Sequence, residues 1–216
     1  QQVQAQQQQE YSPGAFDMFT NLPRNWETWA RRSFKKESVP VILVTMSVSA
    51  ITLVTDYQSW QLTKGPYERV PVYRSFSDVG VLLGDGGPQF GAAALFASYG
   101  FLAGNNRALK TASQLVEVIL STGLVVQSLK RITGRESPSA TETKTGRWRW
   151  FVSPVKYNRH VSKYDAVPSG HIATSLATMT VVIENYPEVK WLPYVGYPVV
   201  GLIGLGLVAT SIHWWS

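Results

Sequence analysis

Two histidines and one lysine occupy positions from which they could act together on an anion. His171 directly follows Pro168-Ser169-Gly170, and His213 lies close to the end of an apolar segment. Lys130 opens a basic stretch that ends at Pro138. A histidine titrates near neutral pH and can take up or donate a proton, whereas a lysine binds phosphate oxygens as a point charge. These residue types therefore predict a site for an anion, provided that the fold brings them together.

The elements that must position these residues are five segments with almost no charge. They are Val39–Thr55, Gly86–Asn106, Thr111–Leu129, Ala166–Ile183 and Trp191–Ser216. A helix needs roughly 20 apolar residues to cross a bilayer, and eight Trp and ten Tyr supply interfacial anchors. The sequence therefore predicts an all-α, polytopic membrane helical bundle with five spans, and we expect a sixth span beyond the chain end. A soluble all-helical protein with unusually buried helices is the alternative.

Three parts of the chain differ in composition. Residues 1–20 are rich in Gln and predict a disordered tail. Residues 21–37 alternate Trp and Phe with Arg and Lys, which is typical of an amphipathic helix on a membrane surface or of a solvated helix packed on the domain. Residues 38–216 form the predicted membrane domain, which we expect to be incomplete at its C-terminal end.

Two polar stretches connect the predicted spans. Residues 56–85 are rich in Gly, Pro and Tyr and predict a connection between the first two spans, and residues 130–167 predict a long basic loop. If successive spans form hairpins, the end of the third, the start of the fourth and the end of the fifth share one membrane face. Lys130, His171 and His213 would then converge.

Composition narrows the chemistry and the partners. The chain has no cysteine, which excludes disulfides, thiolate metal sites and a cysteine nucleophile. None of the three histidines has the spacing of a metal ligand, so no metal site is predicted. The net charge of +6 indicates an anionic partner. Because membrane spans dominate the chain, we expect membrane lipids and an amphiphilic phosphate substrate rather than nucleic acid.

The order of these motifs resembles that of the type 2 phosphatidic acid phosphatase (PAP2) superfamily. The family pattern has a Lys, six residues and Arg-Pro; then Pro-Ser-Gly-His; and finally Ser-Arg, five residues, His, three residues and Asp. Lys130 and Pro138 fit the first element, Pro168–His171 match the second completely, and His213 fits the third. The Gly-Asp-Gly-Gly stretch before the second span is also similar, and the resemblance extends from about Phe76 to the last residue.

The resemblance implies a membrane phosphatase that uses a phosphohistidine intermediate and needs neither metal nor cofactor. His213 would attack phosphorus, and His171 would protonate the leaving oxygen. Lys130, Ser169 and the Gly170 amide would bind phosphate oxygens, the last two at a helix start where the helix dipole favours an anion. The substrate would be a lipid phosphate or diphosphate. The expected location is a bacterial inner membrane, with the active site on the periplasmic side.

The sequence departs from the family pattern at two cationic positions. The Arg before Pro is Ser137, and the Arg six residues before the nucleophile is Leu207. We expect Arg135 to bind the phosphate oxygens in place of the first. The departures leave open a second interpretation, a catalytically degenerate PAP2-like subunit of a membrane protein assembly. A third is a soluble periplasmic phosphatase or haloperoxidase-like relative.

Overall fold

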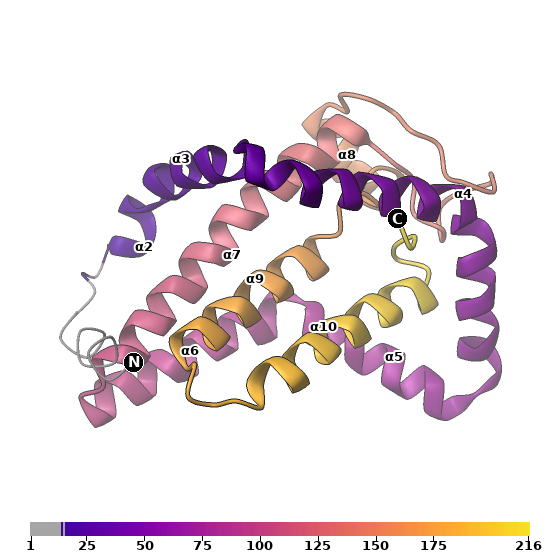
Figure 1. The fold of residues 1–216 in the computed structure, drawn as a ribbon. Coiled ribbons are helices and arrows are strands. Elements are labelled where there is room, and N and C mark those ends of the chain that lie inside the picture. The colour runs from indigo at the N-terminus through magenta and orange to yellow at the C-terminus, as the bar shows by residue number, and fades with distance from the viewer. Residues whose placement is uncertain (1–13, 15) are drawn as a thin grey trace.

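The computed structural model describes residue 14 and residues 16–216, which form helices joined by loops. Helices α7, α9 and α10 lie side by side; α6 packs on α7, and α5 packs on α10 (Figure 1). The prediction of an all-α bundle is confirmed. The α-helices are α2 (Asp17–Thr20), α3 (Leu22–Ser33), α4 (Val39–Arg69), α5 (Pro71–Gly84), α6 (Gly86–Ala103), α7 (Asn106–Thr133), α8 (Pro154–Arg159), α9 (Gly170–Asn185) and α10 (Leu192–Ala209).

Among the described residues, three helical segments are long and apolar enough to cross a membrane. They are Lys36–Arg69, Asn106–Thr133 and Leu192–Ala209, and each contains or overlaps one predicted span. The other two predicted spans form α6 and α9. Helix α9 has 16 residues, a length of about 24 Å at a rise of 1.5 Å per residue. That is less than the hydrocarbon core of a bilayer, about 30 Å.

Residues 56–85 form helices rather than the predicted polar connection. Helix α4 continues to Arg69, and α5 follows it as far as Gly84. Asp56 and Thr63, two polar residues of this segment, are buried against the rest of the protein. Part of the polarity that predicted a loop therefore belongs to internal contacts of a helix.

Helices α5 and α10 approach each other closely because glycines lie at their contact. A Cβ atom on Gly80 would lie 2.7 Å from the carbonyl oxygen of Leu202, and a Cβ atom on Gly206 would collide with the carbonyl of Ser77. Small residues permit this close helix packing in membrane proteins. The contact fixes where α5 ends, and Asp85 at that end reaches the first turn of α9.

Helix termini position two of the predicted site residues. Gly134 adopts a left-handed conformation with φ of 51° and ends α7, so that Lys130 lies in the last turn. The Ser169 hydroxyl accepts a hydrogen bond from the Ile172 amide at 3.4 Å and caps α9. His171 therefore lies in the first turn of α9.

The chain reverses direction after α10, so His213 is not at a helix end as predicted. Helix α10 stops at Ala209, whereas the helix predicted within the last apolar segment extended to about Ile212. Ser211 has a φ of 63°, and the amides of Ile212 and His213 both donate to the carbonyl of Leu207, at 2.9 and 3.1 Å. His213 thus lies in a turn that folds back over the end of α10.

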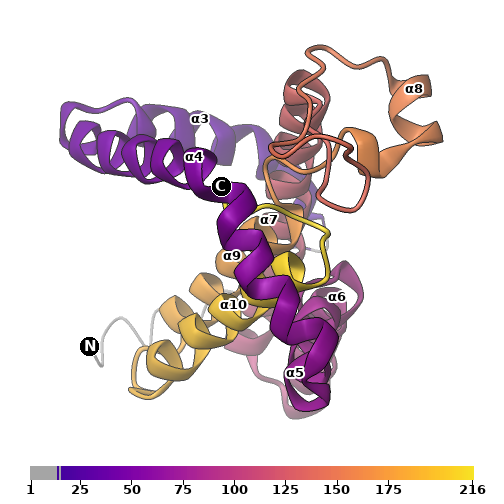
Figure 2. The ribbon, with the colours of Figure 1, turned by 90° about the vertical axis from the view of Figure 1, so that its right-hand side faces the viewer.

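The N-terminal part contains more helix than expected. Of the predicted tail, residues 1–13 and 15 lie outside the described residues, whereas Asp17–Thr20 form a helical turn that contacts α7. Helix α3 falls within the predicted amphipathic segment, residues 21–37. Helix α3 and the first part of α4 extend away from the bundle, on the side opposite the loop that carries α8 (Figure 2).

Candidate active site

The structure brings His171 and His213 together, although 42 positions separate them in the chain. Their ring centroids lie 5.9 Å apart, and the rings meet edge to face at 70°. Lys130 is buried at the end of α7, with its Nζ 3.7 Å from Oδ2 of Asp165. We call this region, at the end of α7, the start of α9 and the turn after α10, the histidine end.

His213 is held in one tautomer by the main chain. Its Nδ1 lies 2.8 Å from the carbonyl oxygen of Ala166. A carbonyl oxygen only accepts hydrogen bonds, so Nδ1 carries the hydrogen and the neutral ring keeps a lone pair on Nε2. This Nε2 is buried and has no hydrogen-bond partner among the described residues. The arrangement leaves a nitrogen nucleophile aimed into the protein without a competing donor.

The environment of His213 keeps its imidazole neutral. Burial lowers its pKa from the ordinary 6.5 to about 3. The positive charges of Lys130 and of protonated His171 act in the same direction, while the hydrogen bond to the Ala166 carbonyl opposes them. His213 is therefore uncharged at neutral pH, the form in which a histidine acts as a nucleophile.

His171 has an acidic partner that the motif analysis did not include. Its Nε2 lies 3.1 Å from Oδ1 of Asp85, the residue between α5 and α6. A carboxylate accepts hydrogen bonds, so Nε2 carries the hydrogen. Gly84 permits this approach, because a Cβ atom there would lie 3.2 Å from the His171 Cβ. The other ring nitrogen, Nδ1, is buried and has no partner within residues 14 and 16–216.

Asp165 links two positions of the first motif. Its Oδ2 faces Lys130, and its Oδ1 accepts a hydrogen bond from the Ser137 hydroxyl at 3.1 Å. The next residue, Ala166, supplies the carbonyl that holds His213. The loop segment around Asp165 therefore connects Lys130 to the buried imidazole.

Arg135, predicted to bind phosphate, is engaged within the protein, and this geometry gives that prediction no support. The Arg135 side chain is fully buried, and its Nη2 lies 2.7 Å from Oδ2 of Asp56 in α4. It also donates to the Thr145 carbonyl and to the Ser216 hydroxyl, and it lies over the ring of Trp214. A guanidinium engaged in this way holds the loop to α4, and the Arg135 side chain has no exposed surface to offer a substrate.

Ser169 and Gly170 lie where the sequence predicted, at the N-terminus of α9. Ser169 is half-buried and caps the helix, and Gly170 is its first residue. Amides in the first turn of a helix have no partner within the helix and favour an anion. Their binding of phosphate stays a prediction.

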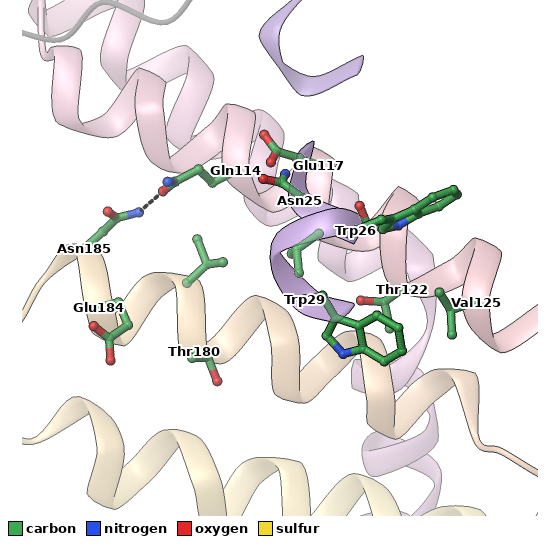
Figure 3. Close-up of a pocket in the computed structure, with 13 residues that line it drawn as sticks. Asn25, Trp26, Trp29, Gln114, Glu117, Thr122, Val125, Thr180, Glu184 and Asn185 are labelled. Atoms are coloured by element: carbon green, nitrogen blue, oxygen red, sulfur yellow. Dashed lines mark hydrogen bonds between the residues drawn. The ribbon is translucent and has the colours of Figure 1, made fainter. Parts of the chain in front are cut away.

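A mostly apolar pocket lies between α3, α7 and α9, and none of the predicted site residues lines it. Its volume is about 500 Å³, and Trp26, Trp29, Glu117, Val125, Thr180 and Glu184 are among the residues that line it (Figure 3). Asn185 donates to Gln114 at 2.7 Å at its edge. We call it the α3 pocket. It contains two carboxylates but neither histidine nor lysine, so it lacks the groups for phosphoryl chemistry.

Comparison with known proteins agrees with the geometry. The family model of the PAP2 superfamily matches residues 111–216. This region belongs to the PAP2 superfamily. The match contains Lys130, the Pro168–His171 motif and His213, and with the apolar helices it identifies a PAP2-type membrane protein. No curated protein and no solved structure matches the chain.

Sequence reasoning missed the acidic residues at and beneath the histidine end. Asp85 lies in the Gly-Asp-Gly-Gly stretch, which indicated similarity to the family. Nothing in that stretch predicted the contact of Asp85 with His171. Asp165 and Asp56 have no motif around them. In the part of the chain that the structure describes, no three His, Cys, Asp or Glu side chains gather in a way that could hold a metal ion.

Proposed function

We propose that this PAP2 protein is a membrane phosphatase that hydrolyses a lipid phosphate or diphosphate through a phosphohistidine. The observation that carries the proposal is the state of His213. Its Nδ1 is bound to a carbonyl, its Nε2 is buried and unpartnered among the described residues, and its pKa is low because of burial. A neutral, oriented imidazole beside a second imidazole and a lysine is suited to attack on phosphorus.

In the first step, Nε2 of His213 forms a bond to phosphorus while the bond to the leaving oxygen breaks. His171, protonated at Nδ1 and oriented by Asp85 at Nε2, gives its proton to that oxygen. Lys130 and the amides at the start of α9 stabilise the charge on the remaining phosphate oxygens. The products are the released alcohol or phosphate, a phosphohistidine and neutral His171.

In the second step, neutral His171 removes a proton from water, whose oxygen attacks phosphorus. The bond between phosphorus and Nε2 of His213 breaks, and inorganic phosphate leaves. Both imidazoles return to their starting states, so each turnover consumes one water molecule. The same nitrogen of His171 serves as acid and then as base.

The apolar helices support an amphiphilic substrate whose headgroup meets the histidine end at the membrane boundary. We further propose that the protein lies in a bacterial inner membrane with this end on the periplasmic side. Because the chain has no cysteine, a single Cys introduced at Glu142, on the α7–α8 loop, reports orientation. A membrane-impermeant maleimide should label this variant in spheroplasts but not a matched Lys190→Cys variant between α9 and α10. The reverse pattern would place the site in the cytoplasm.

Phosphate release from phosphatidate and from a polyprenyl diphosphate tests the activity. The detergent-purified protein should hydrolyse at least one of them in the presence of EDTA. His213→Ala should lower kcat by at least about 10³-fold, since it removes the nucleophile. An acid-labile phosphoryl label should form on the wild type and not on His213→Gln, whose amide can still donate to the Ala166 carbonyl. Full activity of a folded His213→Ala protein would exclude the mechanism.

A specific observation also favours a second function, a non-catalytic PAP2-like subunit of a membrane assembly. Leu207 occupies a family arginine position and is 1% exposed, and the Ser137 hydroxyl is bonded to Asp165. Neither position offers a guanidinium to phosphate. If the wild type is inert toward both lipids while Ser137→Arg gains activity, the subunit function is the better one.

A further inference from the structure

A polar pocket adjoins the histidine end on the outer side of Asp165. It lies between the segment that follows Arg135, the turn after α8 and the turn before His213, and its volume is about 500 Å³. The residues that line it include Arg159, His160, Lys163, Ser139, Ser162 and Asp165. We call it the loop pocket. None of the residues proposed above to bind or attack phosphate lines it.

The walls of the loop pocket are tied together by main-chain hydrogen bonds. The Ser137 amide donates to the Ser162 carbonyl at 2.9 Å, and the Ser139 amide donates to the Ser211 carbonyl at 3.1 Å. These bonds join three segments that are distant in the sequence. The pocket is therefore a defined feature of the fold rather than a gap between independent loops.

The loop pocket carries uncompensated positive charge. Arg159 and Lys163 are exposed, and among the described residues neither forms an ion pair. Other cations of the same loop are engaged, Arg135 by Asp56 and Arg149 by Glu136. The one carboxylate in the pocket wall, Asp165, already faces Lys130 and the Ser137 hydroxyl.

Two residues that line the loop pocket are sequence neighbours of His213 or of the residue that holds its ring. Asp165 precedes Ala166, whose carbonyl holds the His213 ring, and Ile212, in the pocket wall, precedes His213 itself. A ligand bound in the pocket would therefore contact residues directly next to those that hold and carry the His213 imidazole. Ser137, which stands where the family has an arginine, also lines the pocket.

We propose that the loop pocket binds a second phosphate group, with Arg159 and Lys163 as its cationic ligands. For the enzyme this makes a diphosphate headgroup the preferred substrate class, an extension that rests on the proposed function. The serine hydroxyls and His160 supply further hydrogen bonds to phosphate oxygens. Free inorganic phosphate offers the same chemistry as the headgroup, and the two sources are separable by experiment.

Binding is tested first, without catalysis. Pyrophosphate is titrated by calorimetry into the full-length His213→Ala protein, with and without Arg159→Gln plus Lys163→Gln. Loss of two charge-assisted contacts should weaken binding by about tenfold or more. A matched pair, Arg147→Gln plus Lys156→Gln, removes the same charge from exposed positions outside the pocket, one in the α7–α8 loop and one in α8, and should change binding little. Equal weakening by both pairs, or no binding at all, would overturn the proposal.

Kinetics then distinguish the two sources of phosphate. With a diphosphate headgroup as ligand, the Arg159/Lys163 pair should raise KM for the lipid diphosphate about tenfold while leaving KM for the lipid monophosphate unchanged. With free phosphate as ligand, it should instead raise the inhibition constant of inorganic phosphate and leave both KM values unchanged. Equal effects on the KM values of both lipids would contradict the proposal that the loop pocket binds a second phosphate group. An inert wild type that still binds pyrophosphate through these residues would reject the phosphatase function and keep the pocket.

Discussion

The histidine end and the α3 pocket are two regions that share the helices α7 and α9. The α3 pocket is mostly apolar, and its two carboxylates, Glu117 and Glu184, share its lining with tryptophans and with hydroxyl and amide groups. At the histidine end, two imidazoles and a buried lysine meet, with carboxylates holding them in place. The difference teaches that the chemistry of converging side chains, rather than the presence of a cavity, locates the functional site.

The largest effect should come from the buried ion pair beneath the histidine end. Arg135→Met leaves the buried Asp56 carboxylate without its cationic partner, at a cost of about 3–5 kcal/mol of unfolding free energy. Denaturant unfolding in detergent measures the loss. Arg31→Met is the matched control on α3, because the Arg31–Glu27 pair is exposed and should contribute about 0–1 kcal/mol. Similar losses of unfolding free energy in both variants would mean that the buried ion pair contributes no more stability than the exposed one.

Acid should destabilise the histidine end through His213. Its pKa is lowered by burial to about 3 in the folded protein, against 6.5 ordinarily. The unfolded chain therefore binds a proton more readily, and stability falls as pH decreases from about 6.5 toward 3, by at most about 1.4 kcal/mol per pH unit. Thermal unfolding of the wild type and His213→Gln across this range isolates the contribution. Parallel curves for the two proteins would show that His213 is not the source.

A smaller kinetic effect is expected from the carboxylate that orients His171. Asp85→Asn should lower kcat about tenfold, a fraction of what general acid–base catalysis supplies, with little change in KM. Asp85→Glu should recover part of the lost rate because it restores the anionic acceptor. The readout is kcat and KM for the hydrolysed lipid. A change in KM alone, or no recovery by Glu, would argue that Asp85 only supports the fold.

The smallest effect should come from the α3 pocket. Glu117→Gln keeps the size of the side chain and an acceptor for the Asn21 amide, 3.5 Å away. We expect kcat/KM to stay within about twofold of the wild type, since the carboxylate takes no part in the reaction. A loss as large as that of Asp85→Asn would assign a function to this pocket and reverse the comparison.

Residue type and spacing were enough to predict which cationic and imidazole side chains lie together. They were not enough to predict the carboxylates that those side chains contact. The hairpin order of apolar segments predicted that Lys130, His171 and His213 share one end of the bundle. The burial of Arg135 was not predicted because its partner, Asp56, lies 79 positions earlier in a segment that was expected to be a loop. The contact of Asp85 with His171 spans 86 positions and depends on how closely α5 packs on α10. No local pattern encodes such distances.

The contacts of the last residues with α4 have a consequence for the modularity of the protein. Asp56 binds the backbone and hydroxyl of Ser216, and Thr63 accepts from the Trp215 indole, across more than 150 positions of sequence. All of these α4 residues precede the region that the family model matches. A fragment limited to residues 111–216 would retain both imidazoles but lose the contacts with α4 that hold the two residues after Trp214. The region that the family model matches therefore depends on a helix outside the match for the placement of its own last residues.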